Sequence, residues 1–380
     1  MKKFFKRIVK SLCAIMPSVV MFSAYSCGVP GGTSESSGGG KATLKGMTME
    51  RQSDEFKILQ LTDIQIIDPS QQPYDGRLNQ TDEVRWADRD KNAFNLVKRL
   101  VSETDPDWII LTGDNVYGQF DKDGSNFVAL VELMESFKKP WSFVNGNHDG
   151  EYYIVHGGEC VECGKGMRWQ ADYVKNNTQY CMFDSGDEEM GYGNYVIHLT
   201  ENEKPVFSFY MTDTHGCAGY SAAGLTDGQV KWYEESVKNA CDVAGKVVPS
   251  FVYMHIPTKE FYRAMVDYTE VNDIGMISKD GLPAENGDYG MNMENVTYFD
   301  SAEFWAKVKE LDSTKGIFSG HNHTNNSSLM YEGVRLTFGT KTGTYDYNYQ
   351  QGGTLTTINR NGTFSVVPVY DSEGGAYGKK

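Results

Sequence analysis

The feature that most constrains the fold is a regular alternation of strand-like and helix-like segments, which begins at about residue 54 of the 380-residue chain. Short apolar runs at 56–61, 107–112 and 141–144 have the length and composition of buried strands. The two segments between these runs, 84–101 and 127–134, carry apolar residues at helical spacing. A strand–helix–strand–helix–strand order predicts a parallel sheet with helices packed against it.

Two polar, glycine-containing stretches interrupt this pattern later in the chain. Residues 150–194 and 260–297 are both predicted to be long surface loops. The C-terminal part is predicted to be β-rich, with a hairpin turn at Asn361-Gly362. The remaining predicted elements are strands at 195–199, 206–211, 247–254 and 316–319 and helices at about 226–240 and 304–311.

Polar side chains follow five of the predicted strands at the point where each strand ends. Any one of them has a structural explanation, such as an Asx turn or a hydrogen-bonded core histidine. The five together are not explained by turns, because the carboxyl ends of strands in α/β sheets are where sites form. The five groups are Asp63, Gly113-Asp114-Asn115, Gly146-Asn147-His148-Asp149, His255 and Gly320-His321-Asn322-His323.

This set resembles the five motif blocks of the calcineurin-like metallophosphoesterases over roughly residues 54–345. It is also similar to the subgroup related to purple acid phosphatases, through His255-Ile256-Pro257 and Thr342-Gly343. The resemblance implies an α/β fold, a four-layer α/β/β/α sandwich, in a single catalytic domain at 51–372 with loop insertions.

The resemblance also implies a role for each motif residue around two metal ions, which would be iron, zinc or manganese. Asp114 would bridge the ions, Asp63 and His323 would hold the first, and Asn147, His255 and His321 would hold the second. His148 would donate a proton to the leaving oxygen of the substrate. Asp149 would either orient the His148 ring or cap a helix.

Gln65 is where the sequence departs from the family pattern, which has a histidine at this position on the first metal. Tyr117 is an alternative ligand, because Gly113-Asp114-x-x-Tyr117 resembles the purple acid phosphatase motif whose tyrosinate binds iron. Three interpretations stay open: ligation by Tyr117, ligation by the amide oxygen of Gln65, or a weak or vacant position.

Two further predictions concern the substrate entrance. His215 follows the predicted strand 206–211 at the same rim, so it could contact the substrate or be a packed loop histidine. Tyr345 and Tyr347 are predicted to line the entrance.

The N-terminus reads as a secretion signal. Residues 1–26 carry five basic residues and then an apolar segment, and Cys27 follows a small residue as in a bacterial lipoprotein. We expect an exported protein that is anchored in the cell envelope by lipid on Cys27, with a flexible tether at 27–50.

Loss of the five positive charges of the signal would change the formal net charge from −15 to −20, so no nucleic-acid partner is expected. Five cysteines remain once Cys13 and Cys27 are set aside, an odd number that leaves at least one outside any intramolecular disulfide. A small zinc site built on Cys160-x-x-Cys163, Cys181 and His156 is the weaker alternative to disulfides and thiols.

The expected function is hydrolysis of phosphate esters, above all monoesters, by in-line attack of a metal-bound hydroxide. A phosphodiesterase with the same site is the alternative within this chemistry. A surface binding lipoprotein with weakened catalysis is the alternative from another class, and Gln65 is its only support.

Overall fold

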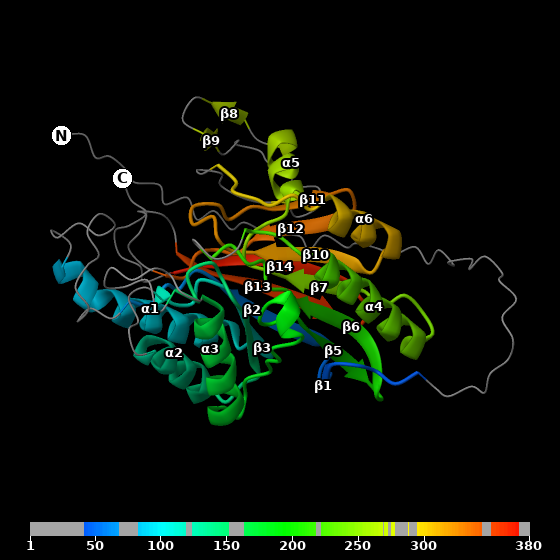
Figure 1. Cartoon of the computed structure of the whole chain (residues 1–380), viewed down its shortest axis with the longest axis horizontal. Helices are drawn as coiled ribbons and strands as arrows, with labels where there is room; N and C mark the ends of the chain where they lie inside the picture. The colour runs from blue at the N-terminus through cyan, green and yellow to red at the C-terminus, as the bar shows by residue number, and fades with distance from the viewer. Residues whose placement is uncertain are drawn as a thin grey trace, which may run out of the picture.

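The computed structural model describes residues 42–67, 83–118, 124–151, 163–217, 222–268, 270–272, 275–277, 288, 295–343 and 351–371. Two large sheets form its centre. One has seven strands in the order β1-β5-β6-β7-β10-β12-β11, and the other has five in the order β14-β13-β2-β3-β4. A small β8–β9 hairpin stands apart from both sheets (Figure 1).

The strands of the seven-stranded sheet are β1 (Met47–Glu50), β5 (Tyr195–Glu201), β6 (Lys204–Met211), β7 (Ser250–Tyr253), β10 (Thr314–Ser319), β12 (Val334–Phe338) and β11 (Ser328–Tyr331). Those of the five-stranded sheet are β14 (Phe364–Tyr370), β13 (Gly352–Asn359), β2 (Glu55–Leu61), β3 (Trp108–Thr112) and β4 (Trp141–Val144). The hairpin strands are β8 (Glu270–Asn272) and β9 (Gly275–Ile277). The helices are α1 (Glu83–Thr104), α2 (Ser125–Ser136), α3 (Cys163–Asn177), α4 (Asp227–Ala244), α5 (Lys259–Tyr268) and α6 (Ala302–Leu311), with a 3-10 turn at Glu188–Met190.

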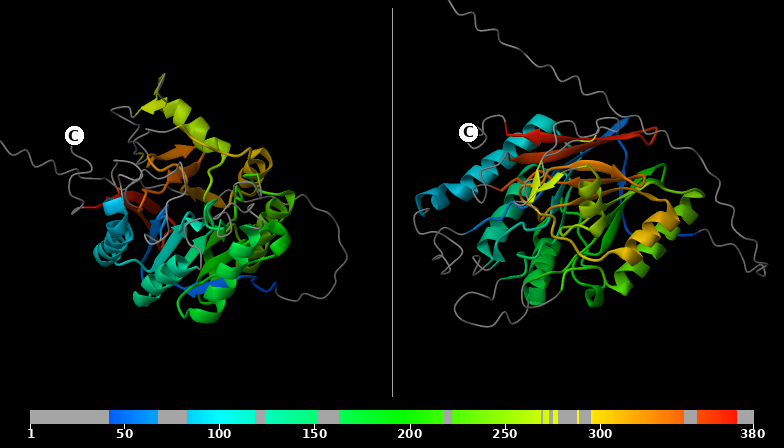
Figure 2. Two further views of the ribbon diagram at one scale, coloured as in Figure 1. Left: turned by 60° about the vertical axis from the view of Figure 1, so that its left-hand side comes forward. Right: turned by 90° about the horizontal axis from the view of Figure 1, so that it is seen from above.

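Helices cover the outer face of each sheet, and the inner faces pack on one another (Figures 1 and 2). Apolar residues of α1, α2 and α3 form one core with the five-stranded sheet, and those of α4, α5 and α6 form a second with the seven-stranded sheet. A third core lies between the sheets. This arrangement confirms the predicted α/β/β/α sandwich.

Side-chain alternation along β2 shows how the sequence serves two cores at once. Phe56 and Ile58 point into the core between the sheets, whereas Leu59 and Leu61 face the helices. Successive residues of a strand point to opposite faces, so a strand that is covered on both sides is apolar at most positions on both faces. The continuous apolar runs read from the sequence therefore mark these central strands.

The two predicted loop stretches contain regular structure, which corrects the prediction. Helix α3 lies within 150–194, while α5 begins at Lys259 and, with the hairpin, extends through the first part of 260–297. The buried face of α3 contains the apolar residues Met167, Ala171 and Val174. Three apolar residues in a polar and glycine-containing segment are too few to predict a helix from the sequence.

Strand β1 lies within the stretch that was predicted to be a tether. It pairs in parallel with β5 through Met47 and Ile197, so the folded sheet begins before residue 51. Cys27, Tyr345 and Tyr347 lie outside the described residues. No helix in the described part of the chain has the length and apolar character to cross a membrane.

The described cysteines include both thiols and a disulfide. Cys217 is disulfide-bonded, while Cys181 is a thiol whose pKa is raised well above the ordinary value by burial. A raised pKa disfavours the thiolate that a zinc site would need from Cys181.

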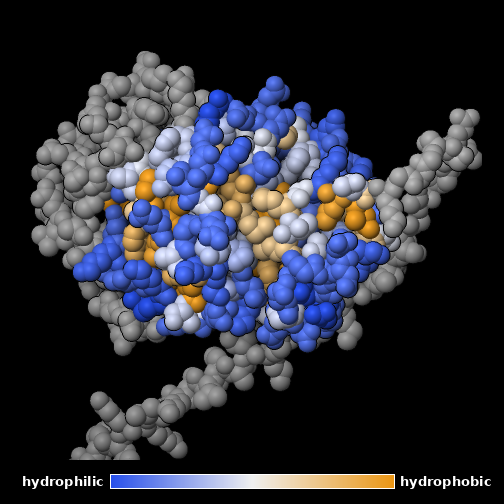
Figure 3. All heavy atoms as spheres, turned by 90° about the horizontal axis from the view of Figure 1, so that it is seen from below, coloured by the Kyte–Doolittle hydropathy of each residue, from blue (hydrophilic) through white to orange (hydrophobic). Residues whose placement is uncertain are grey.

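One face of the molecule is mostly hydrophilic with separate apolar patches (Figure 3), as is normal for a protein surface.

Phe251 tests the core between the two sheets. Its side chain is fully buried, and its ring centroid lies 4.6 Å from that of Phe207 and 5.0 Å from that of Phe318. We expect Phe251→Ala to lower the free energy of unfolding by about 3–5 kcal/mol, because it leaves a cavity in a closed packing layer. Urea unfolding measures the change. The matched control is Val247→Ala, at a side chain that is 38% exposed, with an expected change of about 0.5 kcal/mol or less. Equal effects of the two substitutions would contradict the packing described here.

Candidate metal centre

The loops that follow β2, β3, β4, β7 and β10 converge where the two sheets meet. Strands β2, β3 and β4 run parallel in one sheet, and β7 and β10 run parallel in the other. Direct bonds join the loops across the sheets: His255 Nδ1 lies 2.9 Å from the Thr112 carbonyl oxygen, and the His321 backbone N–H donates to Asp63. The structure thus brings together Asp63, Asp114, Asn147, His148, His255, His321 and His323, as the sequence predicted.

Four side chains present donor atoms to one point on the side of His255. Its Nε2 lies 3.3 Å from Asp114 Oδ1, 3.2 Å from Asn147 Oδ1 and 3.3 Å from His321 Nδ1. The Nδ1 atom of His255 donates to a backbone carbonyl, which leaves Nε2 to face the cluster. This donor set fits a metal ion that accepts nitrogen and oxygen ligands.

A second group of donors lies on the other side of Asp114. Asp63 Oδ1 is 3.2 Å from His323 Nε2. Ligand atoms of Asp63, Asp114 and His323 lie within 4.8 Å of one another, and so do those of Asp114, His255 and His321. Asp114 is the residue that both groups share.

Burial and charge set the ionisation of the central groups. Burial alone would raise the pKa of Asp63, but the hydrogen bond and charge of His323 lower it to about 2. Burial also opposes ionisation of Asp114, yet His255 and His148 hold its pKa well below the ordinary value. Burial and the charge of His255 lower the pKa of His321 to about 4. Both carboxylates are therefore ionised and His321 is neutral at pH 7, as ligands must be. Burial opposes the charge of His255, but Asp114 and Asp63 raise the pKa of His255 to about 9, so a metal bound there would have to displace its proton.

Two glycines of the motifs allow the loops to approach this closely. A Cβ atom on Gly146 would lie 2.2 Å from the backbone nitrogen of Asp114. A Cβ atom on Gly320 would lie 2.0 Å from Thr62 Oγ1, which donates to Asp63 Oδ2. A side chain at either position would collide with these neighbours, so glycine is needed for Asp114 and Asp63 to lie where they do.

Asp149 does not orient the His148 ring, which corrects one of the two predicted roles. Its carboxylate instead accepts backbone N–H bonds from Gly146 (2.7 Å), Asn115 (2.8 Å) and Val116 (3.0 Å). Asp149 thus joins the loop after β4 to the loop after β3. Burial and the nearby charge of Asp114 raise the pKa of Asp149 to about 7.

Glu151 holds the His148 ring instead, and sequence reasoning missed it. Its Oε2 lies 2.7 Å from His148 Nδ1, and the residue is 1% exposed. The opposite ring nitrogen, Nε2, lies 4.0 Å from Asp114 Oδ2 and so faces the centre. The only signal in the sequence was an acid three residues after the histidine.

The structure gives Gln65 a partner that the sequence did not indicate. Lys341 Nζ donates to Gln65 Oε1 at 2.7 Å, while Gln65 Nε2 lies 3.3 Å from Asp114 Oδ2. Tyr117, the alternative ligand, has its ring centroid 4.8 Å from that of His148. Ligation of a metal by Tyr117 stays a prediction.

His215 lies on the neighbouring loop and is fixed by backbone contacts. Its Nδ1 lies 2.9 Å from the Gly224 carbonyl oxygen, and its backbone N–H donates to Asp213. Its positive φ of 55° marks a tight turn. Contact of His215 with a substrate stays a prediction.

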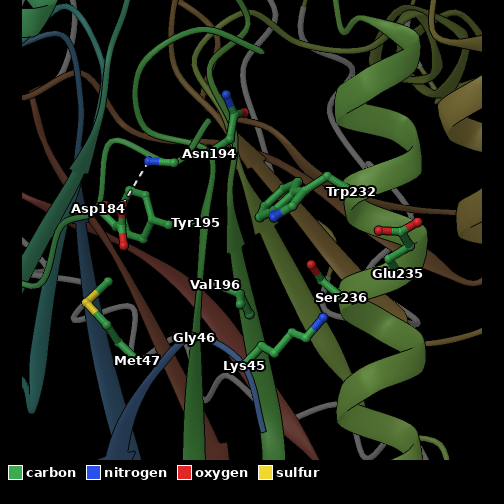
Figure 4. A pocket seen from close by; sticks show the side chains of 11 residues that line it. Lys45, Gly46, Met47, Asp184, Asn194, Tyr195, Val196, Trp232, Glu235 and Ser236 are labelled. Atoms are coloured by element: carbon green, nitrogen blue, oxygen red, sulfur yellow. Dashed lines mark hydrogen bonds between the residues drawn. The ribbon is translucent and has the colours of Figure 1, made fainter. Parts of the chain in front are cut away.

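A cavity of about 440 Å³ lies away from these motifs, between β1, β5 and α4 (Figure 4). Trp232, Glu235 and Ser236 line it from the helix, and Lys45 reaches toward Ser236 from the start of the folded chain. None of the predicted site residues is among the described residues that line it.

The different roles of Asp149 and Glu151 can be separated by unfolding experiments. Asp149→Ala leaves three buried backbone N–H groups without their acceptor, so we expect it to lower the free energy of unfolding by about 3 kcal/mol. Glu151→Gln keeps an acceptor oxygen next to His148 and is expected to cost about 1 kcal/mol or less. Urea denaturation of both variants makes the comparison. An Asp149→Ala variant as stable as Glu151→Gln would contradict the role given to Asp149.

The chain is similar to known proteins over most of its length. The family model of the calcineurin-like phosphoesterases matches residues 56–341. A probable inactive purple acid phosphatase 14 from Arabidopsis thaliana is 25% identical over 325 residues, which cover 77% of this chain and 71% of the relative. A probable inactive purple acid phosphatase 29 from the same plant is 24% identical, with 77% and 73% covered.

The solved structure of a dimetal phosphatase from Danio rerio is similar with a TM-score of 0.47 and 9% identity, covering 83% of this chain and 99% of that one. The family match spans every motif from Asp63 to His323. The chain therefore belongs to the calcineurin-like phosphoesterase family.

Proposed function

We propose that the protein hydrolyses phosphate esters at this centre, with monoesters as the preferred substrates, and that it uses two metal ions. The observation that carries the proposal is the position of Asp114, which is shared by two converging groups of ligand atoms. Two cations held on either side of Asp114 would polarise the phosphoryl group and neutralise the charge that develops on its oxygens. Iron, zinc and manganese all suit this mixture of carboxylate, imidazole and amide donors.

The side chains of the centre have separate roles as metal ligands and as a proton donor. Asp63 and His323 hold one side of the centre, and Asn147, His255 and His321 hold the other. His148 supplies a proton to the leaving oxygen from its Nε2, the ring nitrogen that faces Asp114. Glu151, bonded to the other ring nitrogen, keeps the imidazole in that orientation.

The relatives' names support phosphatase activity and also raise the alternative of a weakened centre. Purple acid phosphatases are named for phosphatase activity, but the two relatives are called probable inactive. Here six candidate ligands and His148 are present and assembled, which favours an active centre. Within the centre, the bond between Lys341 and Gln65 also favours this alternative, a weakened centre on a binding protein.

Two substitutions separate metal binding from proton transfer. Asp114→Asn is expected to lower phosphatase activity roughly 100-fold or more and to lower the metal content, because both ions lose their shared ligand. His148→Asn is expected to lower activity about 10²–10⁴-fold with the metal content unchanged. Hydrolysis of p-nitrophenyl phosphate and elemental analysis provide the two readouts.

The control for both variants is Glu303→Gln, an exposed residue of α6, which is expected to change neither readout. The same assay with bis(p-nitrophenyl) phosphate tests the monoester preference. Unchanged activity in Asp114→Asn would contradict the proposed centre, and faster cleavage of the diester would contradict the substrate class.

We also propose that the chain is exported and anchored by lipid on Cys27. The basic head, the apolar segment and the small residue before Cys27 support this. In a bacterial host grown with an alkyne-tagged fatty acid, the wild type is expected to take up the label and Cys27→Ala is not. A labelled Cys27→Ala protein, or an unlabelled wild type, would contradict the anchor.

A further inference from the structure

A buried lysine, Lys341, contacts Asp63 and Gln65 on the first-metal side of the centre. Lys341 is 5% exposed, and its Nζ donates to Gln65 Oε1 at 2.7 Å and to the Asp63 carbonyl oxygen at 3.0 Å. The sequence patterns gave this residue no role.

The backbone fixes the lysine in place. Lys341 forms a parallel bridge with Thr62, and the backbone N–H groups of Thr342 and Gly343 donate to the carbonyl oxygens of Thr62 and Asp63. The segment that carries the lysine is therefore paired residue by residue with the segment that carries Asp63. Its ammonium group is therefore held in one position within the site and is not a mobile surface charge.

This contact decides which way the Gln65 amide points. An ammonium group can only donate hydrogen bonds, so it must face the amide oxygen and not the amide nitrogen. The amide nitrogen is then directed to Asp114, whose Oδ2 lies 3.3 Å away. Rotating the amide to offer its oxygen to a metal at the Asp63–Asp114 pair would set an N–H₂ group against the ammonium.

We propose that Lys341 makes the two metal positions unequal in affinity. The hydrogen bond from Lys341 keeps the amide oxygen of Gln65 away from the first position. The fixed positive charge of Lys341 also lies beside that position and repels a cation. The first position keeps Asp63, His323 and its share of Asp114. The second position keeps Asn147, His255, His321 and its share of Asp114, so it fills first and the first position fills at higher metal concentration. This inference rests on the proposed binuclear centre.

Stepwise titration of the metal-free, full-length protein with Mn²⁺ by isothermal calorimetry tests the proposal. The wild type is expected to bind in two resolved steps. In Lys341→Met, which removes the charge and frees the amide at similar side-chain length, the weaker step is expected to tighten at least tenfold. The tighter step is expected to stay within threefold of the wild type. Lys246→Met, an exposed lysine beyond α4, is the control for the change in net charge and should alter neither step.

Gln65→Met gives a second, independent test that does not require loss of the lysine. Because the amide oxygen is not a ligand in this account, the weaker step is expected to stay within threefold of the wild type. A tenfold loss in Gln65→Met would show that Gln65 ligates the metal, and it would overturn the proposal. Urea unfolding shows whether each variant is folded, and if Lys341→Met is not, Gln65→Met decides.

Three outcomes of the calorimetry have separate meanings. An unchanged or looser weak step in folded Lys341→Met overturns the role of the lysine and leaves the binuclear centre intact. Two wild-type steps of equal affinity also overturn it alone. A wild type that binds no Mn²⁺, and no Zn²⁺ or Fe²⁺ in its place, contradicts the proposed function together with this inference.

Discussion

Two carboxylates, Asp63 and Asp114, are buried beside each other at the line where the two sheets meet, and both are ionised. Uncompensated negative charge is costly in such a place, so the surroundings must supply positive charge or N–H donors. His323, His255 and His148 lower the pKa of one carboxyl or the other, and the backbone N–H groups of His148 and His321 donate to them. Cations bound between these groups would complete the compensation. The loop geometry, the motif glycines and the orientation of His255 all follow from this one requirement.

Much of the site could be predicted from the sequence because it depends on strand ends. The residue that follows the last apolar position of a parallel strand lies at the carboxyl-end edge of the sheet. The sequence alone could therefore predict that Asp63, Asp114 and His255 lie close together. The fold followed from the same runs of apolar residues. Helix α3 and strand β1 did not, since their few buried residues stand in polar and glycine-containing segments.

Contacts between loops were beyond the reach of sequence reasoning. Asp149 and Glu151 lie two residues apart and have the same type of side chain, and only the path of the loop decides which reaches the His148 ring. Lys341 lies 276 positions along the chain from Gln65, so nothing local connects them. From the sequence, a glutamine in place of the usual histidine indicates only the loss of a ligand, whereas in the structure Lys341 donates to the amide oxygen of this glutamine. Function depends on such local pairs and not on the fold, which the family shares.

The number and position of metal ions around Asp114 test the central claim most directly. Anomalous diffraction from crystals grown with Mn²⁺ would locate them. The account predicts two peaks about 3.5–4 Å apart, with the Asp114 carboxylate between them. It also predicts that at limiting metal the peak beside Asn147, His255 and His321 is the stronger. A single peak that does not contact Asp114, or no peak at saturating metal, would contradict the account.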